Sequence, residues 1–262
     1  MSVTVSSQPL RFSAAAKTYQ GCASVQEAVA DRLATLLPAD AGKEPILEIG
    51  CGTGIMTRRL LKAYPEAEVH ALDFSGHMLA QAAAESPYGD VDWIEADIRE
   101  YRPSGSYSLI VSSSSLHWIE PLDETCAALT ALAELGCTFV ASIMLYGTLS
   151  ELHKARARVA PDKIPWGRLP ELDELTAILK SLGWQIEDAQ EERFNEQHRD
   201  AAAFLRSLHD RGVTGGSVSR ADTPLTRGEL RQLIEFYDAN YHHPAGGVQA
   251  GYHVGLVRAV RS

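Results

Sequence analysis

The sequence has few of the features that mark secreted, membrane-spanning or metal-binding proteins. Its 262 residues include only four cysteines, Cys22, Cys51, Cys126 and Cys137, and no two have a paired spacing. This disfavours a disulfide framework or zinc site, so we expect reduced, mostly buried thiols and no metal. No apolar run approaches the ~20 residues that cross a bilayer. The first ten residues lack a basic segment followed by an apolar one, so we expect a cytoplasmic protein.

Positive charge is also scarce. The formal net charge is −10, which makes nucleic acid and anionic membranes poor candidate partners. The same charge disfavours an acidic protein partner unless a local basic cluster attracts it. Hydrophobic residues make up 45% and charged residues 22%, as in a globular protein with a full core. The length favours a single α/β domain, residues 1–262, with an elaboration.

Short apolar strands alternate with helices in the first part of the chain. Strands are predicted at 46–49, 68–72, 91–94, 109–112 and 138–145, and helices at 24–37, 55–64, 76–85 and 122–134. This alternation indicates a parallel, doubly wound sheet.

Different patterns flank and follow this region. We therefore expect an N-terminal helical segment at 1–38, a cofactor-binding core at 39–146 and a closing strand at 251–260. The segments at about 147–170 and 196–241 mix helical patterns with proline- and glycine-rich stretches, and each follows a sheet strand. Open α/β folds carry such loops above their binding crevice, so we predict a helical lid.

The stretch PILEIGCGTGIM places three glycines, Gly50, Gly52 and Gly54, directly after a predicted strand. Glycines in a strand–turn–helix unit let the backbone approach a ligand closely. A dinucleotide-binding loop would need its third glycine at Ile55. A phosphate-binding loop would need a lysine directly after the last glycine, and the first one present is Lys62.

The spacing Glu48-x-Gly50-x-Gly52-x-Gly54 instead resembles the first motif of Rossmann-like class I methyltransferases that use S-adenosylmethionine. The resemblance implies a mostly parallel seven-stranded sheet and this cofactor. It also implies that Asp73, after the second strand, accepts both ribose hydroxyls, and that Asp97, after the third, holds the adenine amino group. The expected cofactor-binding residues are Glu48, Gly50, Cys51, Gly52, Gly54, Thr57, Asp73, Phe74, Met78, Asp97, Ile98 and Ser113.

Segments outside the core resemble the malonyl-acyl-carrier-protein O-methyltransferases, which methylate a malonyl thioester to begin biotin synthesis. They are RFSAAAKTYQGCASVQEAVADRL, SSSSLHWI, GTLSELHKA, FLRSLHDRGVT and GYHVGLVRAV. The resemblance implies methyl transfer to the free carboxylate of malonyl-acyl carrier protein or malonyl-coenzyme A. There are departures, since His117 replaces a glutamine, His209 a lysine, and Gly251 the threonine before Tyr252.

A carboxylate acceptor is ionised at neutral pH, because its pKa is roughly 4, and it needs no general base. We expect Tyr19, His117 and Trp118 near the reacting methyl group, although Tyr19 and Trp118 also suit core packing. An arginine fork suits a buried carboxylate. The predicted lid offers the basic residues His153, Lys154, Arg156, Arg158, Arg168, Arg206, His209 and Arg211. Of these, we expect His153, Arg156, Arg158 and Arg206 to contact the acceptor carboxylate. Lys154 and Arg158 share a helix face, as solvated surface residues often do.

Three alternatives stay open at this point. Trans-aconitate methyltransferase, which esterifies a small free carboxylate, also has a Gln-Trp pair after its fourth strand. A cofactor-binding protein without turnover would retain the same glycines and acids. A dinucleotide oxidoreductase is disfavoured by Ile55.

Overall fold

The computed structural model describes residues 24–85, 91–165, 167–212 and 223–262. The chain divides into two compact units. The sheet unit comprises residues 26–145, 170–192 and 254–262, and the insert unit comprises residues up to 25, 146–169 and 193–253. Among the described residues, no helix is long and apolar enough to span a membrane.

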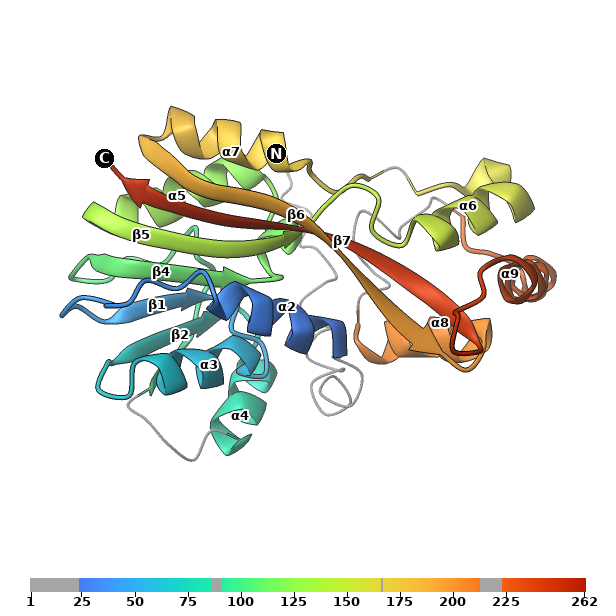
Figure 1. The fold of residues 1–262 in the computed structure, drawn as a ribbon, viewed down its shortest axis with the longest axis horizontal. Helices are drawn as coiled ribbons and strands as arrows, with labels where there is room; N and C mark the ends of the chain where they lie inside the picture. Colours follow the sequence, from blue (N-terminus) through green and yellow to red (C-terminus); the bar gives the residue numbers. More distant parts are fainter. Residues whose placement is uncertain (1–23, 86–90, 166, 213–222) are drawn as a thin grey trace. The chain divides into compact units, whose positions relative to one another are not determined.

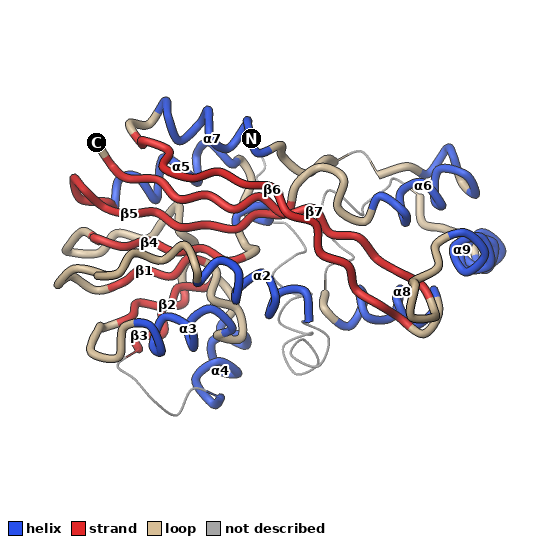
Figure 2. The backbone as a smooth tube through the Cα atoms, viewed as in Figure 1, coloured by secondary structure: helices blue, strands red, loops and turns tan. Residues whose placement is uncertain are grey.

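In the described part of the chain, seven strands form one sheet in the order β3-β2-β1-β4-β5-β7-β6 (Figure 1). They are β1 (Ile46–Ile49), β2 (Val69–Asp73), β3 (Val91–Glu95), β4 (Tyr107–Ser113), β5 (Ala133–Met144), β6 (Trp184–His198) and β7 (Val248–Arg261). The first five strands pair in parallel, and β7 is antiparallel to β5. This confirms the predicted doubly wound, mostly parallel sheet. Figure 2 shows the long strands β6 and β7, which contribute residues to both units.

Helices cover both faces of the sheet within the sheet unit. Figure 1 shows α2, α3 and α4 in front of the strands, with α5 and α7 behind them. The helices of this unit are α2 (Ser24–Ala34), α3 (Ile55–Ala63), α4 (Gly76–Glu85), the 3-10 turn η2 (Leu116–Trp118), α5 (Leu122–Leu132) and α7 (Leu172–Ser181). The insert unit carries α6 (Ser150–Val159), the 3-10 turn η3 (Pro161–Lys163), α8 (Ala201–Asp210) and α9 (Arg227–Asn240).

Strand β1 shows how the sheet divides its side chains between two layers. Leu47 and Ile49 are fully buried in the core that contains residues of α5 and α7. Because successive strand side chains point to opposite faces, Glu48 lies on the α3 side, where it contacts Thr57. All four residues of β1 are buried, and Glu48 places the one carboxylate of this strand on the α3 face of the sheet.

The strand order reverses at β1. This strand pairs with β2 on one edge and with β4 on the other, although β4 follows β3 in the chain. Open α/β sheets bind ligands in the crevice outside the carboxyl ends of the strands at such a reversal. The fold therefore directs attention to the ends of β1, β2 and β4.

Several predicted boundaries differ from the structure. Helix α2 ends at Ala34 and not at 37, and the largest difference is at β5, which was predicted to begin at 138. The pattern predicted a helix over 122–134, but α5 ends at Leu132 and β5 already begins at Ala133, which pairs with Tyr107 of β4. Leu135, one residue beyond the predicted helix, is 80% exposed. Pairing with a strand distant in the sequence decides this boundary, and a local pattern does not contain that information.

Candidate functional site

The glycine loop leaves β1 through three left-handed residues. Gly50, Gly52 and Gly54 have φ angles of 69°, 54° and 78°, a region that residues with a Cβ rarely occupy. The Gly50 amide donates to the carbonyl oxygen of Leu72 over 2.7 Å, and so anchors the loop to the end of β2. Helix α3 begins directly after the third glycine, at Ile55.

The glycines have different neighbours. A Cβ on Gly50 would lie 2.4 Å from the Cβ of Ser115, so that position is closed by packing. A Cβ on Gly52 would meet none of the described residues within 4 Å, so among them it would project into open space at the carboxyl end of the sheet. Gly52 is therefore the loop position at which a ligand can approach the backbone, as a close-fitting adenosyl ligand requires.

A buried carboxylate lies beneath the loop. Glu48 is 1% exposed, and its Oε2 accepts a hydrogen bond of 2.6 Å from the hydroxyl of Thr57 on α3. Burial raises the pKa of Glu48 to about 7, and the nearby Asp73 adds to this increase. Burial also raises the pKa of the Cys51 thiol, which keeps it protonated and unreactive at neutral pH.

Asp73, at the end of β2, fastens the loop to the start of α4. Its Oδ2 accepts from the Gly52 amide and its Oδ1 from the Ser75 amide, both over 2.9 Å. Burial raises its pKa, while these two donors oppose the shift. Each carboxylate oxygen has a second lone-pair site, so these bonds leave acceptor capacity for a ligand. Nearby, Met78 is buried and Phe74 is half-buried.

Asp97 lies just beyond β3 and is already engaged. Its carboxylate forms an ion pair with Arg99, whose Nη2 lies 2.5 Å from Oδ2, and Oδ1 accepts from the Arg99 amide over 2.9 Å. The Arg99 contact lowers the pKa of Asp97, which keeps it ionised. Ile98, between them, is 1% exposed. A ligand amino group at Asp97 would share this carboxylate with an arginine that the sequence reasoning missed.

A run of serines places the end of β4 against the end of β1. The hydroxyls of Ser112 and Ser115 both donate to the carbonyl oxygen of Ile49, over 3.1 and 2.9 Å. Ser113 is half-buried, and the Ser142 hydroxyl donates to its Oγ over 3.4 Å. Ser114 has a φ of 53°, and its buried Oγ has no hydrogen-bond partner among the described residues. The strained backbone and the unsatisfied hydroxyl both occur where the sheet order reverses.

His117 and Trp118 follow in the 3-10 turn η2. Their rings lie 4.8 Å apart between centroids, and both are half-buried. The Nδ1 atom of His117 is buried and makes no hydrogen bond within the described part of the chain. Burial lowers the pKa of His117 to about 3, so the ring is neutral at physiological pH. It can therefore offer a hydrogen bond to a ligand without adding charge.

These features fit an adenosyl ligand. The loop presents open space at Gly52, with ionisable carboxylates at Glu48 and Asp73. Buried polar atoms without described partners occur at Ser114 and His117, and also at Thr53 Oγ1 in the loop. No three side chains of His, Cys, Asp or Glu gather as metal ligands among the residues described.

Comparison with known proteins identifies the family. A family model described as a methyltransferase domain matches residues 46–135. A malonyl-acyl-carrier-protein O-methyltransferase of Geobacter sulfurreducens is 32% identical over 254 residues, which cover 93% of this chain and 94% of that protein. A protein of Ilyobacter polytropus with the same name is 30% identical over 229 residues, 86% of this chain and 84% of that protein. The chain belongs to the malonyl-acyl-carrier-protein O-methyltransferase family.

The fold is shared with solved structures. The YcgJ protein from Bacillus subtilis superposes with a TM-score of 0.63 at 14% identity, over 89% of this chain and 97% of that one. At that identity the similarity concerns the fold alone. The structure and the relatives thus confirm the class I methyltransferase fold expected from the glycine loop.

The basic residues expected near the acceptor in this methyltransferase do not share one environment. On α6, His153 and Arg156 are half-buried, whereas Arg158 is exposed. Arg156 Nε donates to the carbonyl oxygen of Lys163 over 2.8 Å. Arg206, on α8, is exposed. Tyr19, expected near the reacting methyl group, lies outside the described residues.

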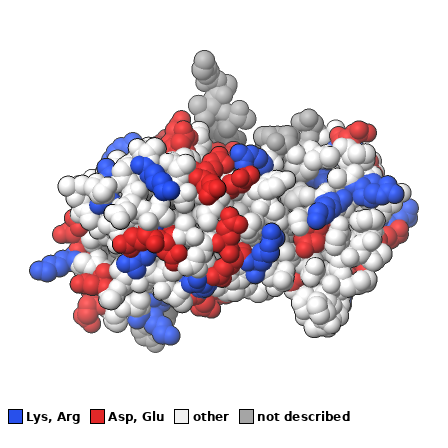
Figure 3. Space-filling model, turned by 45° about the horizontal axis from the view of Figure 1, so that its top comes forward, with Lys and Arg blue, Asp and Glu red and all other residues white. Residues whose placement is uncertain are grey.

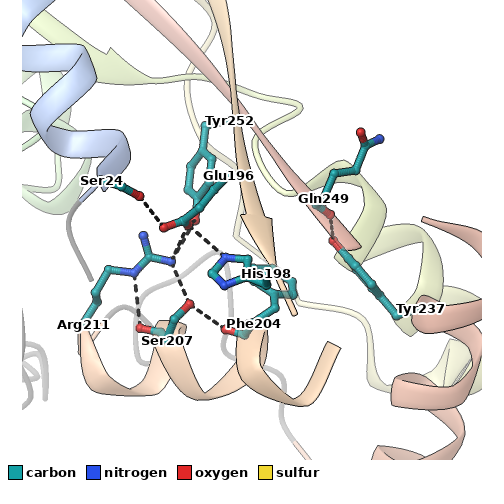
Figure 4. A network of polar contacts seen from close by, with 9 residues as sticks. All are labelled: Ser24, Glu196, His198, Phe204, Ser207, Arg211, Tyr237, Gln249 and Tyr252. Atoms are coloured by element: carbon teal, nitrogen blue, oxygen red, sulfur yellow. Dashed lines mark hydrogen bonds and ion pairs between the residues drawn. The ribbon is translucent and has the colours of Figure 1, made fainter. Parts of the chain in front are cut away.

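Among the described residues of the insert unit, the most buried cation is Arg211, which the sequence offered with the other basic residues of the predicted lid but did not single out. Arg211 is 1% exposed, and its Nη2 donates to Glu196 over 3.1 Å and to the Tyr252 hydroxyl over 2.9 Å (Figure 4). Glu196 also accepts from Tyr252 and Ser24, over 3.0 and 2.7 Å, and lies 3.1 Å from His198 Nε2. Burial alone would raise the pKa of Glu196, but these partners lower it to about 2.

Arg211 follows Arg206 by five residues, and nothing in the local sequence distinguishes the two. A buried arginine requires a buried hydrogen-bond acceptor, and the sequence around Arg211 does not show which distant acid supplies it. Glu196 and Tyr252 are 15 and 41 residues from Arg211 in the chain. Only the folded insert unit brings them together.

Proposed function

We propose that this protein transfers a methyl group from S-adenosylmethionine to the free carboxylate of malonyl-acyl carrier protein. The product would be the methyl ester that enters biotin synthesis. The observation that carries the proposal is the nearly end-to-end similarity to malonyl-acyl-carrier-protein O-methyltransferases, at up to 94% coverage of the relative. The crevice at the carboxyl ends of β1, β2 and β4 supports it with chemistry suited to the donor.

Different residues at this end of the sheet would contact different parts of the donor. Gly52 would face the ligand along its backbone, and Asp73 would receive the ribose hydroxyls through its remaining lone pairs. Asp97 and Ile98 would contact the adenine, the first through its carboxylate and the second through its apolar side chain. The remaining members of the proposed set are Glu48, Gly50, Cys51, Gly54, Thr57, Phe74, Met78 and Ser113. When bound, the donor supplies a methyl group on a positively charged sulfur.

Methyl transfer to the acceptor carboxylate requires that the reacting groups be aligned, and it requires no proton transfer. A malonyl carboxylate is ionised at neutral pH and attacks without a general base. Alignment of the reacting groups can lower a barrier by ~7–11 kcal/mol when the geometry is good. We assign positioning of the reacting groups to Tyr19, His117 and Trp118. Because His117 is neutral, it can hydrogen-bond the acceptor without protonating it.

The acceptor carboxylate also needs a positive partner. The candidates stay those of the sequence, His153, Arg156, Arg158 and Arg206. Of these, His153 and Arg156 are half-buried, and burial lowers the pKa of both. Arg156 stays charged at neutral pH, whereas the lowered pKa of His153 makes its ring neutral. Partial burial therefore favours Arg156 over the exposed Arg158 and Arg206, because a desolvated ion pair is screened less by water and salt.

The proposal is tested by supplying three acceptors separately. The protein is incubated with S-adenosylmethionine and either malonyl-acyl carrier protein, malonyl-coenzyme A or trans-aconitate. Mass spectrometry then records which acceptor gains a methyl group, and chromatography records S-adenosylhomocysteine. We expect methylation of malonyl-acyl carrier protein. Methylation of trans-aconitate alone would refute the malonyl acceptor, and absence of S-adenosylhomocysteine with every acceptor would refute transfer itself.

A further inference from the structure

One segment of the insert unit is basic in a chain that is acidic as a whole. Residues 146–169 contain five basic and two acidic residues, a net charge of +3, while the whole chain carries −10. They are Lys154, Arg156, Arg158, Lys163 and Arg168 against Glu151 and Asp162. Lys154 and Arg158 lie four residues apart on α6, and both are exposed. Figure 3 shows basic side chains gathered over α6 on the face in view.

Turn η3 connects this basic helix to the first turn of α9. Arg156 of α6 donates to the carbonyl oxygen of Lys163, and the ammonium group of Lys163 lies 2.8 Å from Glu229 of α9. Glu229 also completes the capping box of α9 with Thr226. The Glu229 carboxylate therefore accepts from the Lys163 ammonium group, which neutralises its charge, and from the amide and hydroxyl of Thr226. Of the charged residues in the first turns of α9, this leaves the exposed Arg227 and Arg231 to set the outward charge.

Two large apolar side chains are exposed beside that ion pair. Ile164 follows Lys163 and is 54% exposed, and Leu230 follows Glu229 and is 42% exposed. They are two of the four large hydrophobic side chains that are exposed in the described part of the chain. Leu230 lies between the exposed Arg227 and Arg231 in α9. Exposed apolar side chains with arginines nearby are typical of protein interfaces, in which the apolar centre is buried and the charged rim selects the partner.

We propose that these residues form a docking surface for the carrier protein that presents the malonyl group, through an acidic, partly apolar face of that protein. The surface, called here the η3 surface, consists of Lys154, Arg158, Ile164, Arg227, Leu230 and Arg231. The inference rests on the proposed function, because it takes the carrier protein as the source of the acceptor. A local basic surface would allow a chain with a net charge of −10 to attract an acidic partner. The charges of this surface act at contact distance, whereas salt screens the charges that lie farther away.

A charge-reversal variant separates docking from chemistry. Arg227→Glu and Arg231→Glu are combined, because both side chains are exposed, no described contact depends on them, and neither is a candidate partner of the acceptor carboxylate. Binding of fluorescently labelled holo-acyl carrier protein is measured by anisotropy, and steady-state kinetics are measured with malonyl-acyl carrier protein and malonyl-coenzyme A. We expect Kd and KM for the carrier protein to rise about tenfold or more, and KM for malonyl-coenzyme A to stay within about twofold.

A matched variant controls for the change in net charge. Lys43→Glu with Arg102→Glu reverses two exposed basic residues of the sheet unit and shifts the net charge by the same amount. We expect this variant to bind the carrier protein as the unmodified protein does. A third variant, Ile164→Ser with Leu230→Ser, should weaken carrier binding while preserving its dependence on salt, because it removes apolar contact and leaves the charges.

The outcomes distinguish the two levels of the proposal. Unchanged carrier binding in the Arg227→Glu, Arg231→Glu variant, or equal weakening in the Lys43→Glu, Arg102→Glu control, would overturn the η3 surface and leave the methyltransferase proposal intact. Parallel loss of activity with malonyl-coenzyme A would also overturn it, because the residues would then serve folding or chemistry. If the unmodified protein methylates no malonyl thioester, the proposed function fails and the docking surface fails with it.

Discussion

At the scale of single residues, the crevice combines backbone geometry with unusual ionisation. The loop glycines allow conformations and distances that side chains would block, and the carboxylates beneath them are held away from water. Burial favours the neutral form of both Glu48 and His117. It raises the pKa of Glu48 to about 7 and lowers the pKa of His117 to about 3. A crevice with few fixed charges suits a ligand that brings its own cationic sulfur and its own carboxylate.

Gly52 gives a test of the open space in the crevice. Gly52→Ala places a Cβ where the structure has no atom within 4 Å, and at a φ of 54°. We expect affinity for S-adenosylhomocysteine to fall at least about tenfold, equivalent to about 1.4 kcal/mol. Stability should fall by only the ~1–2 kcal/mol of a left-handed alanine. Isothermal titration calorimetry and thermal unfolding measure the two effects.

Gly136 provides the control for that substitution. It has a φ of 84°, and a Cβ there would also meet nothing within 4 Å, but it lies in β5 and away from the loop. Gly136→Ala should therefore show the same backbone cost and normal ligand affinity. Equal affinities for the two variants would mean that no ligand approaches Gly52.

Glu48 makes stability depend on pH. Its pKa is about 7 in the folded protein against an ordinary 4.5, so the folded state retains a proton that the unfolded state has lost. The free energy of unfolding should therefore fall as pH rises from about 4.5 to 7, by roughly 3 kcal/mol at about 1.4 kcal/mol per pKa unit. Glu48→Gln keeps an acceptor for Thr57 and should flatten this slope, as measured by urea unfolding at several pH values. A slope identical to that of the unmodified protein would exclude Glu48 as its source.

At the scale of elements, the insert unit is held by one buried charge cluster. Arg211, at the end of α8, joins Glu196 of β6 and Tyr252 of β7, and Ser24 at the start of α2 completes the cluster. Removing one partner of a buried ion pair leaves the other charge uncompensated. We therefore expect the packing of α8 on the two strands to depend on both charges of the cluster being present.

Arg211→Met tests this role. We expect a loss of about 3–5 kcal/mol in the free energy of unfolding, because Glu196 would stay buried without its cation. The exposed Arg206→Met, on the same helix, should change stability by less than about 0.5 kcal/mol. Denaturant unfolding measures both, and hydrogen exchange should show the loss of protection in α8 and β7. Similar stabilities for the two variants would show that the cluster contributes little.

At the scale of the whole molecule, the net charge and the local charge of the basic segment act over different distances. The net charge of −10 opposes an acidic partner at long distance, while the net +3 of residues 146–169 acts close to the surface. The residues of the proposed cofactor site that the structure describes belong to the sheet unit, and the proposed docking surface belongs to the insert unit. The lid role expected for residues of the insert unit stays a prediction.

Ligand binding should stabilise the molecule by mass action. S-adenosylhomocysteine at about 100 times its Kd should raise the free energy of unfolding by about 2.7 kcal/mol. Hydrogen exchange should slow in the glycine loop and at the ends of β2 and β4, where the proposed contacts lie. Thermal unfolding with and without ligand measures the first effect. NAD, which should produce neither, is the control, and stabilisation by NAD instead would favour the dinucleotide alternative.

The sequence by itself determined the parallel sheet and the proposed cofactor-binding positions. Strands, turn glycines and the acids that end β2 and β3 follow from patterns only a few residues long, and parallel strands then bring their carboxyl ends to one edge. Tertiary structure alone decided that Ser115 closes the space beside Gly50, that β5 begins at Ala133, and that Arg211 rather than Arg206 is buried. The environment of such a residue is set by segments far away in the chain, because burying a charge is favourable only where those segments supply its partner.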